Sequence, residues 1–401
     1  MITGALPLTA VIAAATILAF WLDYKIPALG RVGASLLALA LGALLSNLGL
    51  IPGASPVYDT IAGPVTMMAI AWLLLAVNLS DLGRAGPHMV GAFVLAALGT
   101  ALGAFVGAFI FADFLGENTW KLAGTLTGTY SGGSVNFTSV ATGVELPASL
   151  FSGATAADAT TTGIWLAATL LLPTWIGRFY PPVPTSALAV DGAAIAAGAE
   201  DDRHAQHPFF QRESISTMDL AKLMAAALLL LAGSQLLADW LGSLAQSGRV
   251  PGWVGEISTV LWLTTFALIL GHTKWFHRPA GAMQLGTLAL HFFFVVIGAW
   301  SRISEIMAVG VEVFFYTLVI VAVHGLVVFG GGRLVRIDVG SLAVASQAAV
   351  GGPSSALAVA VSRKWPGLVL PGIIVGLLGY AVGTYLGFGV AYLLRGLGVG
   401  L

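Results

Sequence analysis

Long apolar stretches separated by short polar ones run along nearly the whole chain. Each stretch is close to the length that crosses the hydrocarbon core of a bilayer as a helix, about 20 residues. The pattern therefore predicts an all-α polytopic membrane protein. Its ten expected spans are residues 6–22, 30–50, 60–80, 88–112, 149–176, 216–241, 253–271, 281–300, 306–330 and 367–394.

Two further segments, 120–145 and 338–362, are long enough to cross a membrane but are rich in glycine and small polar residues. The first contains GTYSGGSVNF and the second contains QAAVGGPSS. A Gly-Gly pair breaks a helix and lets the backbone approach a ligand. Broken backbone at membrane depth is tolerated only where it is buried in protein or lines a wet cavity. We expect each segment to form a re-entrant or broken-helix hairpin with its glycine pair at the tip.

The placement of Lys and Arg indicates whether these two segments cross. If both cross, the 17 basic residues divide 10 to 7 between the two sides; if both are re-entrant, they divide 13 to 4. Because cytoplasmic loops collect positive charge, the re-entrant arrangement is favoured. Each half then has five spans, the second half is inverted relative to the first, and both termini are non-cytoplasmic. Inverted repeats with broken helices are typical of secondary transporters.

A polar segment at 179–214, rich in Pro, Ala and charge, separates the two halves and is expected to be a cytoplasmic linker. The first repeat is expected at 1–178, with its hairpin at 120–145. The second is expected at 215–401, with its hairpin at 338–362.

The amino-acid composition argues against a soluble protein, a nucleic-acid-binding protein and an enzyme. The chain is 58% hydrophobic and 9% charged, whereas soluble domains carry about 25% charged residues. It has no basic tract that would indicate a nucleic-acid partner, and no cysteine for disulfides or thiolate metal sites. It also lacks an HExxH motif and a convincing nucleophile–base pair, so an enzyme is not expected.

One carboxylate lies well inside a predicted span: Asp158, in GATAADATTTGIW. A charge at mid-bilayer costs on the order of 3 kcal/mol, so such residues usually face a cavity and bind an ion or proton. Thr162 follows it by one helical turn. A structural hydrogen bond to a neighbouring hairpin is the alternative role. The expected ion-binding residues, with Asp158 as the Na⁺ ligand, are Asp158, Asn136, Thr138, Thr162 and Gln347.

The hairpin tips are the expected solute site. Helix N-termini favour anions, and the small polar side chains add neutral donors and acceptors. Packing of small residues between membrane helices is the alternative explanation, and it is the one expected for the glycines at 372–387 in the last span. The expected substrate-binding residues are Ser131, Gly132, Gly133, Ser134, Gly351, Gly352, Pro353, Ser354 and Ser355.

These motifs, together with the Asp158 segment, resemble the YjcL-like family of integral membrane proteins across the whole chain. More distantly, the order of spans and Gly-Gly segments is similar to that of glutamate:sodium symporters and citrate-type hydroxycarboxylate carriers. That resemblance implies inverted five-span halves with Gly-Gly hairpins, and elevator motion of a core against a dimeric scaffold. Neither hairpin contains an arginine that could clamp a substrate; Arg363 follows the second one. This departure from the carriers argues against a dicarboxylate.

The sequence thus predicts a multi-pass inner-membrane secondary transporter that couples Na⁺ to symport of a small organic solute, an amino acid or organic acid, by an elevator mechanism. A homodimer is expected, with no cofactor besides the coupling ion. A proton-coupled carrier or a cation/proton antiporter is the alternative, because one buried carboxylate could serve either. A channel is the weaker rival.

Overall fold

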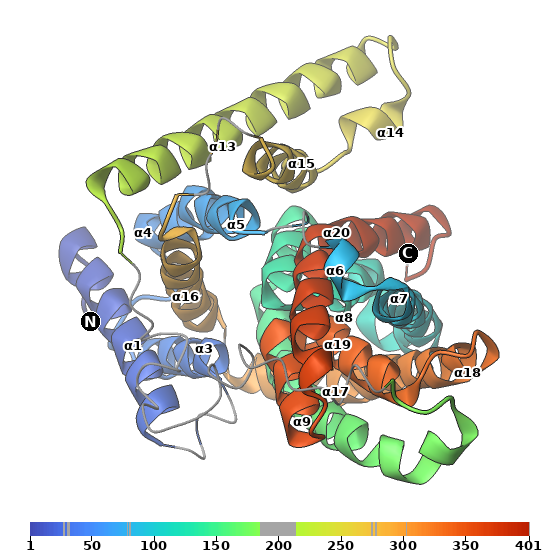
Figure 1. Ribbon diagram of the computed structural model, residues 1–401. Coiled ribbons are helices and arrows are strands. Elements are labelled where there is room, and N and C mark those ends of the chain that lie inside the picture. The colour runs from blue at the N-terminus through green and yellow to red at the C-terminus, as the bar shows by residue number, and fades with distance from the viewer. Residues whose placement is uncertain are drawn as a thin grey trace. The chain divides into compact units, whose positions relative to one another are not determined.

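A computed structural model describes residues 1–26, 29, 33–77, 79, 82–184, 214–273, 276, 279–301 and 303–400. Within these residues every regular element is helical (Figure 1). The α-helices are α1 (Ala5–Lys25), α3 (Ala34–Asn47), α4 (Pro56–Thr60), α5 (Thr66–Leu75), α6 (Leu82–Ala85), α7 (Pro87–Leu115), α8 (Thr119–Gly143), α9 (Ala148–Ile176), α13 (Thr217–Gln246), α14 (Gly252–Gly255), α15 (Thr259–Gly271), α16 (Ala282–Trp300), α17 (Ile303–Gly325), α18 (Gly332–Leu334), α19 (Val339–Ser362) and α20 (Val369–Gly396).

The predicted all-α membrane fold is confirmed. Eight helical stretches of the described residues are long and apolar enough to cross a membrane, and α3 and α15 are shorter apolar helices. Each of the ten predicted spans coincides with one of these stretches or helices. Most of the predicted linker, residues 185–213, lies outside the described part of the chain. The inverted relation of the two halves stays a prediction.

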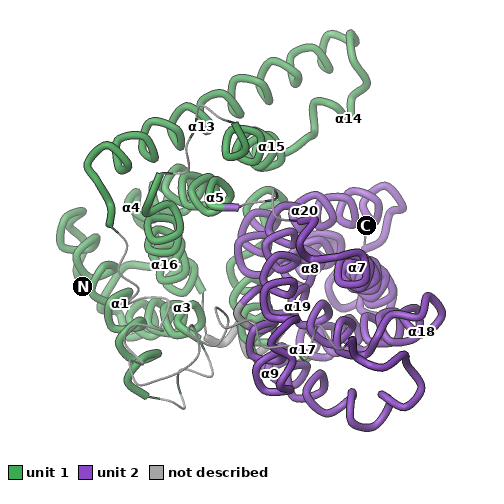
Figure 2. The backbone as a smooth tube through the Cα atoms, viewed as in Figure 1, with its two compact units in different colours: residues 1–76, 142–159, 202–311 green, residues 77–141, 160–201, 312–401 purple. Residues whose placement is uncertain are grey.

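The chain forms two compact units, and each unit is built from segments of both sequence halves (Figure 2). The two compact units therefore do not coincide with the two predicted repeats. The boundaries of the repeats stay predictions. Unit 1 comprises 1–76, 142–159 and 202–311; unit 2 comprises 77–141, 160–201 and 312–401.

In unit 1, helices α3 and α16 pack backbone against backbone at two glycines. A methyl group on Gly42 would overlap the carbonyl oxygen of Val295, and one on Gly298 would overlap that of Leu39. Between membrane helices there is little hydrophobic driving force, so this close van der Waals packing is what holds them together. The pair of glycines therefore fixes the crossing of α3 and α16.

In unit 2, helices α7 and α17 pack in the same way along a glycine stripe. Gly99, Gly103 and Gly107 of α7 recur every four residues, so they lie on one face of that helix. A methyl group on Gly103 would lie 2.7 Å from the carbonyl oxygen of Ile320, and one on Gly99 would lie 3.0 Å from the Cα of His324. This contact brings the α17 backbone, and His324 with it, directly against α7.

We predict that Gly298→Ala lowers the thermal unfolding temperature of the purified protein. The added methyl group would meet backbone, which cannot move aside as a side chain can, and overpacking of this kind costs about 1–3 kcal/mol. Gly233→Ala in α13 is the matched control, because nothing lies within 4 Å of a methyl group there. The control is expected to keep or raise the unfolding temperature, since alanine favours helix over glycine. Equal shifts for the two variants would contradict the packing described.

Candidate functional site

Helix α8 reverses direction at Gly133. This glycine has φ 74° and ψ −169°, a conformation that is essentially reserved for glycine. In a straight helix, residues 128 and 140 would be about 18 Å apart. Instead, a methyl group on Gly128 would lie 3.1 Å from Cγ2 of Val140. Residues 119–132 and 134–143 are therefore two antiparallel arms of a helical hairpin, hairpin 1, with the glycine pair at its tip.

Helix α19 reverses at Gly352 in the same way, with φ 78° and ψ −172°. Val344 and Ala356 are twelve residues apart in sequence, yet both lie within 3.3 Å of the position that a methyl group on Gly372 would take. Pro353 begins the returning arm, where a missing N–H costs nothing because the first turn of a helix has no intrahelical acceptor. Residues 339–351 and 353–362 therefore form hairpin 2. That either hairpin enters and leaves a membrane on one side stays a prediction.

Both hairpin tips pack on the same part of α20. A methyl group on Gly132 would overlap the carbonyl oxygen of Gly379, and one on Gly376 would lie 2.8 Å from the nitrogen of Pro353. Gly376 and Gly379 are three residues apart, so they lie within one turn of α20. The predicted close packing along the glycines of the last span is thus confirmed, and it brings the two tips together.

Tyr380 of α20 lies against both turns. A methyl group on Gly133 would be 3.4 Å from Cε1 of its ring, and one on Gly352 would be 3.6 Å from its hydroxyl oxygen. The Tyr380 side chain is half-buried. It is therefore the one side chain on α20 that the described contacts place beside both glycine turns, and sequence inspection did not single it out.

Asn136 fastens hairpin 1 to α20. Its Nδ2 donates to the carbonyl oxygens of Gly132, at 2.8 Å, and Gly379, at 3.1 Å. Its Oδ1 accepts the hydroxyl proton of Thr384 at 2.6 Å. Because two carbonyls can only accept, the orientation of the amide is fixed. The residue predicted as an ion ligand therefore uses both its N–H groups, and one acceptor site, to hold the tip in place.

Three of the predicted site residues carry buried polar atoms without a hydrogen-bond partner among the described residues. They are Ser131 Oγ, Thr138 Oγ1 and Gln347 Nε2, and all three side chains are fully buried. Ser131 is at tip 1, and Gln347 Nε2 lies 2.9 Å from where a methyl group on Gly351 would be, beside tip 2. Each unpaired group costs about 1–3 kcal/mol. A bound hydrogen-bond acceptor would satisfy the Gln347 amide N–H, and the two hydroxyls could each donate to or accept from a ligand.

The three other serines predicted at the tips lie in different surroundings. Ser134 is exposed at the start of the returning arm of hairpin 1. Ser355 donates its hydroxyl to the carbonyl oxygen of Gly351 at 2.8 Å, so it closes tip 2 as Asn136 closes tip 1. The side chain of Ser354 lies outside the described part of the chain.

The predicted ion ligands fall in different units. Asp158 and Thr162 are both half-buried on α9, but Asp158 belongs to unit 1 and Thr162 to unit 2. Asn136, Thr138 and Gln347 also belong to unit 2. That Asp158 shares one ion site with them stays a prediction.

A buried chain of hydrogen bonds joins the two hairpins through His324 of α17. Trp165 Nε1 donates to Ser346 Oγ at 2.9 Å, and Ser346 Oγ lies 2.8 Å from His324 Nε2. On the other side of the ring, His324 Nδ1 lies 2.9 Å from Thr100 Oγ1, which donates to the carbonyl oxygen of Tyr130 at 2.9 Å. Ser346 precedes Gln347 in hairpin 2, and Tyr130 precedes Ser131 in hairpin 1. We call this chain the His324 relay.

The donors of the relay can be assigned by elimination. Thr100 gives its only proton to the Tyr130 carbonyl, so it accepts from an N–H on His324 Nδ1. In a neutral ring Nε2 is then the acceptor, and it takes the Ser346 proton while Ser346 Oγ accepts the Trp165 N–H. Every group of the relay is satisfied when His324 is neutral. The sequence showed only an isolated histidine in an apolar span; the other members of the relay come from four other helices, α7, α8, α9 and α19.

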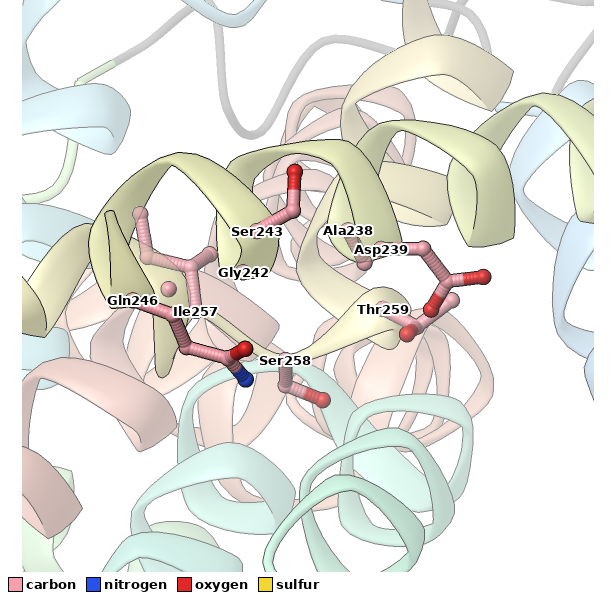
Figure 3. Close-up of a pocket in the computed structure, with 9 residues that line it drawn as sticks. Ala238, Asp239, Gly242, Ser243, Gln246, Ile257, Ser258 and Thr259 are labelled. Carbon is pink, nitrogen blue, oxygen red and sulfur yellow. The ribbon is translucent and has the colours of Figure 1, made fainter. Parts of the chain in front are cut away.

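A separate hollow of about 490 Å³ lies on unit 1, between α13 and the segment from α14 to α15 (Figure 3). Asp239 and Gln246 of α13 line it, together with Ser258 and Thr259 at the start of α15. Asp239 Oδ1 accepts from Gln235 Nε2 at 3.2 Å. None of the predicted site residues lines this hollow.

The fold and the two glycine-tipped hairpins define a multi-pass helical membrane protein. Its chain belongs to a family described as "Protein of unknown function (DUF819)", whose model matches residues 10–397. It is similar to the uncharacterized membrane protein YjcL of Bacillus subtilis (strain 168), with 28% identity over 358 residues that cover 89% of this chain and 88% of YjcL. The resemblance to the YjcL-like family is thus confirmed.

We predict that Ser346→Ala destabilises the protein, because it removes the acceptor of the Trp165 N–H and the donor to His324 at once. Each buried group left unpaired costs about 1–3 kcal/mol, which should appear as a lower thermal unfolding temperature. Ser362→Ala, at the exposed end of the same helix, is the control. In wild-type protein, ¹⁵N NMR of the imidazole should show the proton on Nδ1 of His324. A signal from the Nε2–H form would contradict the assignment of the relay.

Proposed function

We propose that this protein is a secondary active transporter that carries a small organic solute, an amino acid or organic acid, across the inner membrane together with Na⁺. The observation that supports it most is the meeting of two hairpin tips on α20, beside the unpaired atoms Ser131 Oγ and Gln347 Nε2. Breaks in helices and unpaired buried groups both leave polar groups without intrahelical partners, which costs stability. Such costs are tolerated at sites that bind a ligand.

The tips suit a carboxylate of the solute. Each returning arm begins at its tip, and the first turn of a helix presents backbone N–H groups that favour an anion. The Ser131 hydroxyl and the Gln347 amide are further donors. Residues 122–143 and 339–362 contain no Lys, Arg, Asp or Glu. Without a cation to balance a second negative charge, the site fits a solute with one carboxylate better than a dicarboxylate.

Asp158 is proposed as the charged ligand of the coupling ion. His324 is the other ionisable group singled out here, but both of its nitrogens are engaged in the relay and its neutral form satisfies every member. A proton-coupled carrier or a cation/proton antiporter is the second candidate, and it would use the same Asp158 carboxylate.

Transport would proceed by an elevator motion in which unit 2 moves as one body. That unit contains hairpin 1 up to Ala141, hairpin 2, α20, and the relay helices α7 and α17 from Glu312 onward. The Asn136 and relay hydrogen bonds tie the hairpins to their supports, so the solute site at the tips would move without coming apart, whereas the Asp158 carboxylate belongs to unit 1. A homodimeric scaffold is part of this proposal, by resemblance to the elevator carriers.

The first prediction of the proposal is that Ser131→Ala weakens solute binding while it stabilises the empty protein. The variant removes an unpaired buried hydroxyl, which favours the empty state, and also removes a donor to the solute, worth about tenfold in affinity. The matched control is Ser139→Ala in the same hairpin, whose hydroxyl already donates to Val135. A thermal-shift screen of amino and organic acids in Na⁺ would identify the solute, and titration would give its affinity. Unchanged affinity in Ser131→Ala would contradict the site.

The second prediction concerns the coupling ion. Asp158→Asn removes the charge but keeps the shape, so uptake into proteoliposomes should lose its dependence on Na⁺ concentration. Asp239→Asn, at the hollow on α13, is the control and should keep that dependence. If Asp158→Asn retains full Na⁺ dependence, Asp158 is not the ion ligand. If wild-type uptake ignores Na⁺ but acidifies the vesicle lumen, the proton-coupled alternative holds.

A further inference from the structure

Two arginines of unit 2 lie against one exposed aromatic ring. The Cζ of Arg178 is 4.7 Å from the centroid of the Phe179 ring, and that of Arg333 is 5.4 Å from the same centroid. Phe179 is 48% exposed. Arg178 lies in the 3₁₀ turn η3 (Gly177–Phe179) after α9, whereas Arg333 lies in α18. The fold therefore brings two guanidinium groups from distant parts of the sequence to within about 10 Å of each other.

Further basic residues belong to the same end of α9. Arg363 Nη1 donates to Thr174 Oγ1 at 2.9 Å, one helical turn before Arg178. Residues 165–184 and 326–368 together hold five basic residues and one acidic residue. The basic residues are Arg178, Arg333, Arg336, Arg363 and Lys364.

The one acidic residue in these two segments, Asp338, is not available to neutralise them. It is buried, and its two oxygens accept from the Ser341 backbone at 2.9 Å and from the Ser341 hydroxyl at 2.7 Å, which caps α19. Like charges gathered in this way repel one another unless an anion lies between them. The cluster thus has an excess of positive charge within the described residues.

Exposed apolar side chains border the same cluster. Leu334 is 85% exposed and Val335 is 59% exposed, and both directly follow Arg333. Trp175, one turn before Arg178 on α9, is 66% exposed. Aromatic and basic residues at the end of an apolar helix are typical of the level where acyl chains meet lipid headgroups. The topology predicted from the sequence assigns all five basic residues to the cytoplasmic side.

Tyr180 holds this region in place. Its hydroxyl donates to the carbonyl oxygen of Phe329 at 2.8 Å, in the π-helical turn η4 (Leu326–Gly331) just before α18. Burial raises the pKa of the Tyr180 phenol, and the nearby Arg333 guanidinium opposes that rise. The bond ties the end of α9 to the segment that carries Arg333, so the two arginines are positioned before any ligand arrives.

We propose that this cluster binds the headgroup of an anionic phospholipid, with the phosphate between Arg178 and Arg333 and the acyl chains beside Leu334 and Val335. Guanidinium groups match phosphate with paired hydrogen bonds. The exposed apolar side chains select a lipid over a free anion. This inference does not depend on the transport function.

The test uses the full chain and measures phosphatidylglycerol bound per protein by native mass spectrometry, with phosphatidylcholine as the reference lipid. Wild type should bind phosphatidylglycerol in preference. Arg178→Gln and Arg333→Gln should each weaken that binding about fivefold, from the worth of one basic residue at an anionic surface. Arg249→Gln, an exposed arginine of unit 1, is the matched control and should bind as wild type.

Three outcomes would overturn the proposal. The first is equal binding of the two lipids. The second is phosphatidylglycerol binding that Arg178→Gln and Arg333→Gln leave unchanged. The third concerns the acidic residues Glu200, Asp201 and Asp202 between the two halves. If their joint replacement by Gln, Asn and Asn raises phosphatidylglycerol binding severalfold, that acidic segment is the occupant of the cluster, and not lipid. Unchanged binding in that variant supports the lipid.

Discussion

A backbone that leaves the helical conformation inside an apolar protein must find new partners for its polar groups, and this requirement governs unit 2. The chain reverses twice, at Gly133 and Gly352, each time in a conformation that only glycine adopts easily. Both turns depend on α20, whose glycines let the tips approach to backbone contact and whose Gly379 carbonyl accepts the Asn136 amide. The glycines of α20 and the hairpin tips therefore specify one another.

The polar groups around the tips fall into two sets with different roles. Asn136, Ser355 and the His324 relay use their hydrogen-bonding capacity within the protein, so they hold the hairpins in position. Ser131, Thr138 and Gln347 retain unused capacity while fully buried. A site that binds a solute needs both, because a ligand is recognised by free groups on a rigid frame. The proposed carrier function rests on this division.

Much of the fold could be predicted from sequence, because span length and apolar composition are local properties. The two Gly-Gly motifs also predicted where helices break, since glycine and proline act on their own backbone. The partners of His324 could not be predicted in that way: Thr100 is 224 residues away in sequence, and nothing near His324 indicates it. Asn136 was assigned to an ion because its amide suits one, but the Gly379 carbonyl that engages it becomes a neighbour only after folding. Tyr380 was missed for the same reason.

The most direct test of a solute site at the tips uses the absence of native cysteine. Ser134 is exposed at tip 1, so Ser134→Cys gives a protein with a single thiol at the proposed site. Its rate of modification by a maleimide is measured with and without Na⁺ and the solute that stabilises the protein most in the thermal-shift screen. We predict that solute and Na⁺ together slow this modification strongly and leave the modification rate of a single thiol introduced at Ser243, on α13, unchanged. A modification rate at residue 134 that saturating solute does not change would contradict this prediction.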